Sequence, residues 1–171
     1  MTDRLFFALW PGEVQRAALA KTQMGLRSHR GRLAHAQDLH ITLVFLGDLD
    51  VDRRASAEQA AGRVRAAPFR LTLDRFGCFP RAGILWCGAS ERPQSLLSLL
   101  GSLDGNLLDC GFRPERRPFV PHVTLVRKAR PAPARELTPP IDWPVSAFAL
   151  AIARPGERPR YRVVREWPLA S

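Results

Sequence analysis

Lysine and cysteine are both scarce in this chain of 171 residues. The 26 basic residues include only two lysines, Lys21 and Lys128, so arginine carries nearly all of the positive charge. The three cysteines, Cys78, Cys87 and Cys110, form no C-x-x-C motif, which argues against a disulfide framework and against a structural zinc site. We therefore expect free cysteines in a reducing compartment.

Long apolar runs are also missing. The first one, Leu5–Trp10, ends at Pro11 and is too short for a signal peptide or for a membrane-spanning helix. No later segment reaches membrane-spanning length either. The sequence therefore predicts a cytoplasmic protein that does not enter a membrane.

Positive charge, by contrast, is abundant, with a formal net charge of +10. A strongly basic chain favours polyanions such as RNA, DNA or acidic membrane surfaces. Arginine in place of lysine suits a bidentate grip on phosphate. The alternative is an ordinary solvated basic surface, and charge alone does not separate the two interpretations.

A short motif, His-x-Thr-Leu, occurs twice, in His40–Leu43 and in His122–Leu125. Each copy lies in a run typical of a β-strand, and side chains alternate between the two faces of a strand. The His and the Thr of each copy therefore share one face, and the apolar residues share the other. One copy is an unremarkable strand, but two copies in a chain with four histidines predict a functional pair. His29 and His35 lack the pattern and are expected in loops.

The two copies are separated by 82 positions, and the same offset relates Pro11 to Pro93. Each proline follows an apolar run and opens a segment with a helical pattern, which suits proline at the first helical position. This spacing indicates a degenerate internal repeat. We expect a two-lobed molecule with pseudo-twofold symmetry, in which the two motif strands face each other across a cleft.

The whole chain, residues 1–171, is expected to form one α+β domain with helices outside two antiparallel sheets. We expect a monomer, because the apolar stripes of the helices are used within the lobes; in the third helix that stripe is predicted from Leu96 to Leu108. The Pro-rich stretch 131–140 is expected as a stiff extended surface segment. The helices are expected at 11–25, 51–66 and 93–110, and the strands at 4–10, 39–46, 69–74, 83–88, 122–126, 145–153 and 161–167.

Two imidazoles that face one phosphate-sized gap are suited to acid–base catalysis, because the pKa of histidine lies near neutrality. The hydroxyls of Thr42 and Thr124 can donate hydrogen bonds to non-bridging phosphate oxygens, where negative charge builds up in the transition state. This arrangement requires no metal and no cofactor. The nearby carboxylates, Asp38 and Asp48, lie at strand ends rather than on the motif faces.

Beyond these motifs, the chain resembles the two-histidine (2H) phosphoesterases over nearly its whole length. Within them it is similar to the RNA 2′,3′-cyclic phosphodiesterases, also called LigT-like proteins or 2′-5′ RNA ligases. The paired His-x-Thr motifs are the specific part of the likeness. The flanking matches are Arg4–Ala8, Leu39–Leu43 with Phe45–Gly47, Leu71–Leu73, Leu85–Gly88, Arg117–Leu125 with Arg127, and Tyr161–Leu169.

The resemblance implies a two-lobed fold whose antiparallel sheets line a central cleft. It also implies hydrolysis of the 2′,3′-cyclic phosphate ends of RNA or nucleotides to a 2′-phosphate, and reversible 2′-5′ ligation of tRNA halves. A 2′-phosphate product requires the 3′ oxygen to leave. We assign His122 as the base that activates water and His40 as the acid that protonates this oxygen, and ligation in the reverse direction would exchange the two roles.

The position five residues after each motif histidine is occupied by Phe45 in the first copy and by Arg127 in the second. The resemblance implies that Arg127 binds phosphate and that Phe45 stacks on a base. Strict strand alternation places both on the face opposite to the histidines, and only a bulge would bring them round. For Phe45 the alternative is a core position.

Several other residues near the motifs carry weaker expectations. Arg116 and Arg117, just before the second motif, can reach phosphate. Phe7, Trp10 and Tyr161 are expected as core aromatics, with Tyr161 a candidate for the rim of the cleft.

Two alternatives to the cyclic phosphodiesterase remain open. One is an RNA-binding module without catalysis, although pure binding does not need paired imidazoles. The other is a different branch of the same superfamily, acting on ADP-ribose cyclic phosphate, on 2′-5′ oligoadenylate or on an RNA 3′ end. The motifs are shared across branches and do not distinguish their substrates.

Overall fold

The computed structural model describes residues 2–115 and 117–170. The strands are β1 (Asp3–Leu9), β2 (Arg32–Leu33), β3 (Ile41–Leu49), β4 (Phe69–Phe79), β5 (Ile84–Gly88), β6 (His122–Arg127), β7 (Arg135–Val145), β8 (Ala147–Ala153) and β9 (Tyr161–Pro168). The helices are α1 (Glu13–Met24), α2 (Val51–Gly62) and α3 (Gln94–Asp109), with short 3₁₀ turns η1 (Ala36–Asp38) and η2 (Pro80–Ala82). The expected α+β composition and the antiparallel pairing are confirmed.

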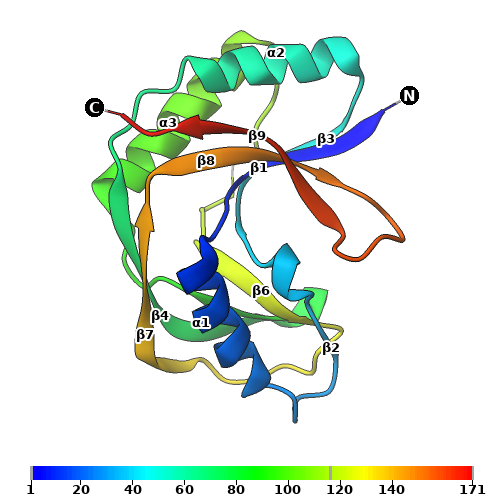
Figure 1. The fold of residues 1–171 in the computed structure, drawn as a ribbon, viewed down its shortest axis with the longest axis vertical. Helices are drawn as coiled ribbons and strands as arrows, with labels where there is room; N and C mark the ends of the chain where they lie inside the picture. Colours follow the sequence, from blue (N-terminus) through cyan, green and yellow to red (C-terminus); the bar gives the residue numbers. More distant parts are fainter. Residues whose placement is uncertain (1, 116, 171) are drawn as a thin grey trace.

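The strands form two halves that meet at the middle of the molecule (Figure 1). One half has the order β3-β1-β8-β9 and the other the order β6-β5-β4-β7, with β2 added beside β6. The halves are joined where Ile41 of β3 pairs with Val123 of β6 in antiparallel register. The two motif strands therefore lie side by side rather than facing each other, which corrects our expectation. The cleft begins where β3 and β6 diverge from this pair.

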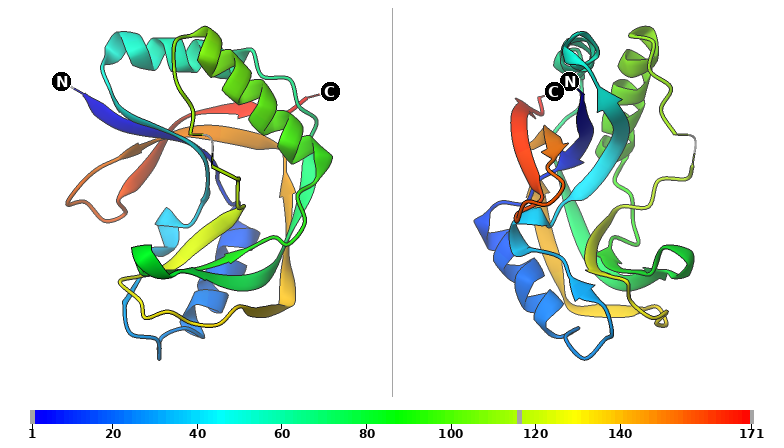
Figure 2. Two further views of the ribbon diagram at one scale, coloured as in Figure 1. Left: turned by 180° about the vertical axis from the view of Figure 1, so that it is seen from behind. Right: turned by 90° about the vertical axis from the view of Figure 1, so that its right-hand side faces the viewer.

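The helices are exchanged between the halves. Helix α1 follows β1 but packs against the other half, where Gln15 donates to the carbonyl of Asp142 on β7 and Gln23 donates to the carbonyl of Leu125 on β6. Helix α3 follows β5 but lies beside α2, and Asn106 donates to the carbonyl of Ala60 there. Both views in Figure 2 show α2 and α3 together on the half that contains β1 and β3.

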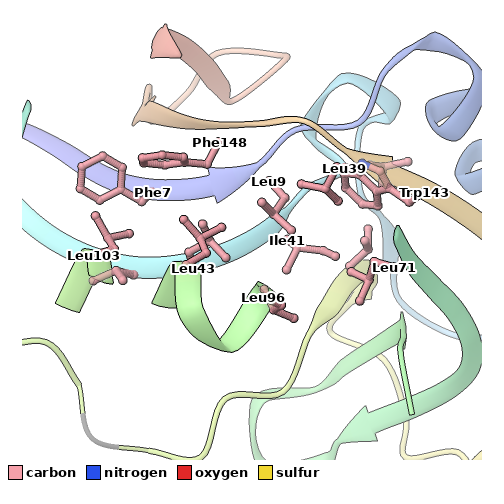
Figure 3. Close-up of a cluster of buried hydrophobic side chains, with 14 of the residues drawn as sticks. Phe7, Leu9, Leu39, Ile41, Leu43, Leu71, Leu96, Leu103, Trp143 and Phe148 are labelled. Carbon is pink, nitrogen blue, oxygen red and sulfur yellow. The ribbon is translucent and has the colours of Figure 1, made fainter. Parts of the chain in front are cut away.

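The apolar side of α3 forms part of the main core. Figure 3 shows Leu96 and Leu103 of this helix directed toward Ile41 and Leu43 of β3, with Phe7 of β1 above them. These side chains are buried, as the spacing predicts. Leu107, another member of the expected stripe, is buried as well, whereas its members Leu97 and Leu108 are exposed and Leu99, which the stripe left out, is buried.

The Pro-rich segment is extended and largely exposed as expected, but residues from Arg135 onward also form β7, which pairs with β4. Ile141, Trp143 and Val145 alternate as buried residues along this strand. Strand β7 lies at the edge of the sheet, where a missing proline N–H leaves no ladder bond unmade. Val145 belongs to this strand rather than to the next one, which begins at Ala147.

The lengths of the helices also bear on membrane contact. Within residues 2–115 and 117–170, no helix is both long and apolar enough to cross a membrane.

Candidate active site

The two motifs are brought together by the single pair that joins the halves. Because Ile41 lies opposite Val123 in antiparallel register, His40 lies beside Thr124 and Thr42 lies beside His122. The cavities agree with this placement, since one is lined by His40 and Thr124 and the other by Thr42 and His122. Each histidine is therefore next to the threonine of the other repeat, and we call this four-residue arrangement the crossed motif pair.

Each motif strand contains a bulge at the same repeat position. In β3 the register shifts between Thr42 and Val44, and in β6 it shifts between Thr124 and Val126, so one leucine in each strand is an extra residue. Strand alternation is interrupted there.

The bulges decide where the fifth residue after each histidine lies. Phe45 and Arg127 are brought to the same face as the motif histidines, and both line cavities beside them. Phe45 is 69% exposed, so the alternative of a core position for it is wrong. Strict strand alternation predicts that Phe45 and Arg127 lie on the face opposite to the histidines unless a bulge intervenes. Such a bulge is present in both motif strands.

Both imidazoles are oriented in the same way. His40 Nδ1 donates to the carbonyl of Asp38 at 2.7 Å, and His122 Nδ1 donates to the carbonyl of Val120 at 2.7 Å. Since a carbonyl oxygen only accepts, the proton of each neutral ring lies on Nδ1 and the lone pair lies on Nε2. At His40 this Nε2 is 3.0 Å from the hydroxyl of Thr42, which can donate to it.

Burial favours the neutral form of both rings. Desolvation by burial lowers the pKa of His40 from its ordinary value of 6.5 to about 4, against the hydrogen bond to the Asp38 carbonyl and the Asp38 charge, which raise it. Burial also lowers the pKa of His122, against its hydrogen bond to Val120. The charge of Arg127, which lines the same cavity as His40, lowers the pKa of both histidines.

Aromatic rings flank each histidine. Trp10 stacks on His40 with ring centroids 5.2 Å apart and an interplanar angle of 5°, while Phe6 and Tyr161 approach at 5.0 and 5.1 Å. Trp10, expected in the core, is partly exposed next to the site, and Tyr161 is partly exposed at the cavity beside His40, which agrees with the alternative of a rim position. Of the three aromatic residues expected in the core, Phe7 is the one that is fully buried.

The rings beside His122 come from other elements. Phe79 meets the imidazole edge-on at 4.9 Å, and Trp86 lies 5.9 Å away. Trp86 lies against Gly77 and Gly88, where a Cβ would come within 2.1 and 2.9 Å of the indole ring. The two glycines thus make room for the ring that packs beside His122.

Asp38 has a positioning role that sequence reasoning missed. Its carbonyl orients His40, and its carboxylate accepts hydrogen bonds from the backbone N–H groups of Arg160 and Tyr161 at 3.0 and 2.9 Å. This residue therefore ties the start of β9 to the first histidine. The partner is more than a hundred positions away along the chain, and no local pattern indicates it.

Two cavities flank the crossed motif pair. The smaller one, which we call the basic cavity, has a volume of about 360 Å³ and contains His40, Thr124 and Arg127. The larger one, which we call the apolar cavity, has a volume of about 840 Å³ and contains Thr42, Phe45 and His122. Further side chains of the basic cavity are Arg32, His35, Arg158 and Arg160; further side chains of the apolar cavity are Phe79, Arg81, Asp104, Arg117 and Phe119.

The outcome for the remaining expected residues is mixed. Arg117 lines the apolar cavity but forms an ion pair with Glu115 at 2.6 Å. Arg116 lies outside the described residues. His35, expected in an ordinary loop, caps η1 by accepting from the backbone N–H of Gln37 and borders the basic cavity.

The arrangement brings two imidazoles, which suit proton transfer near neutral pH, onto adjacent strands. In the described part of the chain, no three His, Cys, Asp or Glu side chains cluster closely enough to hold a metal ion. Two neutral imidazoles with inward Nε2 atoms, two hydroxyls and one nearby guanidinium suit acid–base chemistry on an anionic phosphate ester.

Comparisons with known proteins agree with this class of site. Residues 8–157 match the 2′-5′ RNA ligase superfamily. The RNA 2′,3′-cyclic phosphodiesterase of Escherichia coli strain K12 is 32% identical over 98% of this chain and 97% of its own length. The protein of the same name from Thermus thermophilus is 34% identical over 86% of this chain and 80% of its own. The crystal structure of E. coli LigT complexed with 3′-AMP superposes with a TM-score of 0.87 and 30% identity, covering all of both chains.

The fold and the paired histidine motifs define a 2H phosphoesterase. Within that class, the chain belongs to the 2′-5′ RNA ligase superfamily.

Proposed function

We propose that this protein hydrolyses the 2′,3′-cyclic phosphate ends of RNA or nucleotides to a 2′-phosphate, without a metal ion, by paired histidine acid–base catalysis. The observation that carries the proposal is the crossed motif pair, in which each histidine lines a cavity together with the threonine of the other repeat and holds its Nδ1 on a backbone carbonyl. The names of the relatives from E. coli and T. thermophilus support the choice of substrate.

His122 serves as the base for water and His40 as the acid for the departing 3′ oxygen. The Asp38 charge supports this order, because it acts on His40 in favour of the protonated form that an acid needs. Burial holds His40 neutral in the free protein. The negative charge of a bound phosphate, placed beside the ring, supplies the further stabilisation that the imidazolium requires.

Thr42, Thr124 and Arg127 bind the non-bridging phosphate oxygens. The two hydroxyls lie on opposite sides of the pair, one in each cavity, so the phosphate can be held from both sides. Arg127 acts on the pKa of both histidines, which supports a position near the scissile phosphorus. Donors that meet charge as it develops lower the barrier most.

The apolar cavity takes the nucleoside base, with Phe45 as a stacking surface. Its volume of about 840 Å³ is within the range of small-molecule sites, and Phe79 and Phe119 line it as well. Base stacking on an aromatic ring is tolerant of sequence, because every base has a π-face.

The same proposal covers the setting of the enzyme. Residues 1–171 act as one two-lobed domain, as a monomer and in the cytoplasm, on RNA ends such as those of tRNA halves, with 2′-5′ ligation as the reverse reaction. The net charge of +10 supports an RNA substrate, and the free Cys78, Cys87 and Cys110 support a reducing compartment.

The deciding experiment measures turnover of a 2′,3′-cyclic nucleotide in excess EDTA, with the product isomer identified. The variants are His40→Ala and His122→Ala, and His29→Ala is the matched control because it lies in the turn after α1 and outside both cavities. We expect chelator-resistant formation of the 2′-phosphate. Each active-site variant should lose on the order of a thousandfold in kcat, the usual contribution of a positioned acid or base, while the control keeps its activity.

Other results would contradict the proposal in identifiable ways. Activity abolished by EDTA would indicate a metal-dependent reaction. Release of the 3′-phosphate would assign the leaving group to the other oxygen. RNA binding that survives in both histidine variants, with no turnover by the wild type, would favour a binding module or a different cyclic phosphate.

A further inference from the structure

The basic cavity contains more positive charge than one phosphate needs. Four arginines line it, namely Arg32, Arg127, Arg158 and Arg160. Among the described residues, none of the four forms an ion pair, whereas arginines elsewhere on the surface pair with carboxylates, as Arg4 does with Asp48.

The two carboxylates of the same cavity are already engaged. Asp38 accepts from the backbone N–H groups at the start of β9, and Glu157 pairs with Arg162 at 2.5 Å. Among the described residues neither forms an ion pair with a cavity arginine, and two negative charges do not balance four guanidinium groups. The excess charge is therefore left facing the cavity, which is the usual preparation for a polyanionic ligand.

Arg127 differs from the other three because it lies on β6, the strand that also holds His122 and Thr124. Its charge lowers the pKa of both His40 and His122. Arg32 of β2 is the backbone register partner of Arg127 on β6. The positive charge of the cavity therefore continues from β6 onto β2. Arg158 and Arg160 lie in the β8–β9 turn, which extends to the same side of the molecule as β2 in Figures 1 and 2.

We propose that Arg32, Arg158 and Arg160 form a second phosphodiester site next to the catalytic one, so that the protein prefers an RNA chain to a cyclic mononucleotide. This inference rests on the proposed function, since Arg127 and the crossed motif pair take the scissile phosphate. The second phosphate has two sources. It is the diester on the 5′ side of the terminal nucleotide, or the first diester of an acceptor strand whose 5′-hydroxyl attacks in ligation.

The experiment compares three substrates that end in a 2′,3′-cyclic phosphate. They are cyclic AMP with the 2′,3′ linkage, the dinucleotide ApA with a charged diester, and the same dinucleotide with a neutral methylphosphonate. The variant Arg158→Gln/Arg160→Gln should lower kcat/KM for the charged dinucleotide about tenfold more than for the mononucleotide, because each exposed arginine makes a modest phosphate contact. The salt dependence of KM for the charged dinucleotide should fall by a slope of about one per lost contact.

A matched control removes the same charge elsewhere. Arg63→Gln/Arg65→Gln lies after the end of α2, outside both cavities, and should leave the ratio between dinucleotide and mononucleotide as in the wild type. The methylphosphonate dinucleotide should respond to the cavity variant no more than the mononucleotide does. This separates a diester contact from a general effect of net charge.

A second arm identifies the source of the phosphate. ApA with a free 5′-hydroxyl and no cyclic phosphate is used as an inhibitor of mononucleotide hydrolysis. If the substrate ratio is unchanged but inhibition by ApA weakens about tenfold in the cavity variant, the site belongs to the acceptor strand. Equal losses on all substrates, or no selective loss in either arm, would overturn the second site.

Failure of the proposed function has a different signature. In that case the wild type turns over none of the cyclic substrates, and binding of ApA is measured directly. Binding that weakens about tenfold in the cavity variant, but not in the control, would retain the second site without the catalysis. Equal binding by all three proteins would overturn the site as well.

Discussion

The half around His40 and the half around His122 share one design and differ in what surrounds it. Both have the same motif, a bulge at the same repeat position, and a histidine whose Nδ1 donates to the carbonyl two residues earlier. They differ in burial and in the cavity that each histidine borders. His40 borders the basic cavity and His122 the apolar cavity.

The shared features are those that acid–base chemistry on a phosphate needs twice, namely an inward nitrogen and a hydroxyl on each side. The differences lie where the two sides of the substrate differ. The fifth residue after the histidine is Phe45 in one half and Arg127 in the other, and the matching bulges bring both to the cleft. In the proposed function, the features common to both repeats supply the reaction, and the features that differ set the direction in which a nucleotide lies.

The largest expected difference between the halves is in acid stability. Because the pKa of His40 falls from 6.5 in the unfolded chain to about 4 in the folded one, the unfolded state binds the extra proton between these values. The contribution is fully present above pH 6.5 and is lost as pH falls toward 4, about 2 kcal/mol between pH 7 and pH 4.5. The free energy of unfolding, measured with urea at both pH values, should change less with pH in His40→Gln than in the wild type.

The matched variant of the other half is His122→Gln. The pKa of His122 is also lowered by burial, so the sign is the same. The pH dependence of the free energy of unfolding should change less in His122→Gln than in His40→Gln. Equal slopes for the two variants would show that the two histidines are buried alike, and the comparison would fail at that point.

Substitution of the two motif threonines should have the same effect in both halves of the molecule. Thr42→Val and Thr124→Val each remove one hydroxyl, from opposite sides of the proposed phosphate position, and keep the side-chain shape. We expect kcat/KM to fall about tenfold in both, the cost of one hydrogen bond to a charged group. Thr42→Ser and Thr124→Ser should retain most of the activity, and losses that differ by more than tenfold between the halves would break the pseudo-twofold interpretation.

The smallest effect is expected at Phe45. Phe45→Ala should raise KM for a cyclic mononucleotide about fivefold with little change in kcat, because a stacking surface holds the base without touching the reacting atoms. Phe45→Tyr keeps the ring and should behave as the wild type. A fall in kcat with an unchanged KM would contradict a base-stacking role in this half.

Much of this site can be read from the sequence, because the motif, the offset and strand alternation are local. His40, Thr42, His122 and Thr124 follow from the repeat alone. What failed was the face of Phe45, since a bulge depends on the pairing of β3 with β1 rather than on the residues of β3. Alternation is reliable only where the ladder is regular.

Features that depend on distant contacts could not be predicted. Asp38 is bonded to the start of β9, and Arg158 and Arg160 reach the basic cavity from a turn late in the chain. The antiparallel fold was predictable from the strand patterns. The side-by-side position of β3 and β6 was not, because a repeat specifies equivalence between two strands but not how they meet.

The exchange of helices has a consequence for how the chain folds. Helix α1 covers the half that contains β6 and β7, and α3 lies with α2 on the half that contains β3. Neither repeat can complete its own hydrophobic core, because a helix of each repeat packs against the strands or helices of the other. Contacts between residues about a hundred positions apart must therefore form before either core is shielded from water. This requirement makes the folding transition slow and cooperative. A chain cut between the repeats should yield two fragments that are ordered only together.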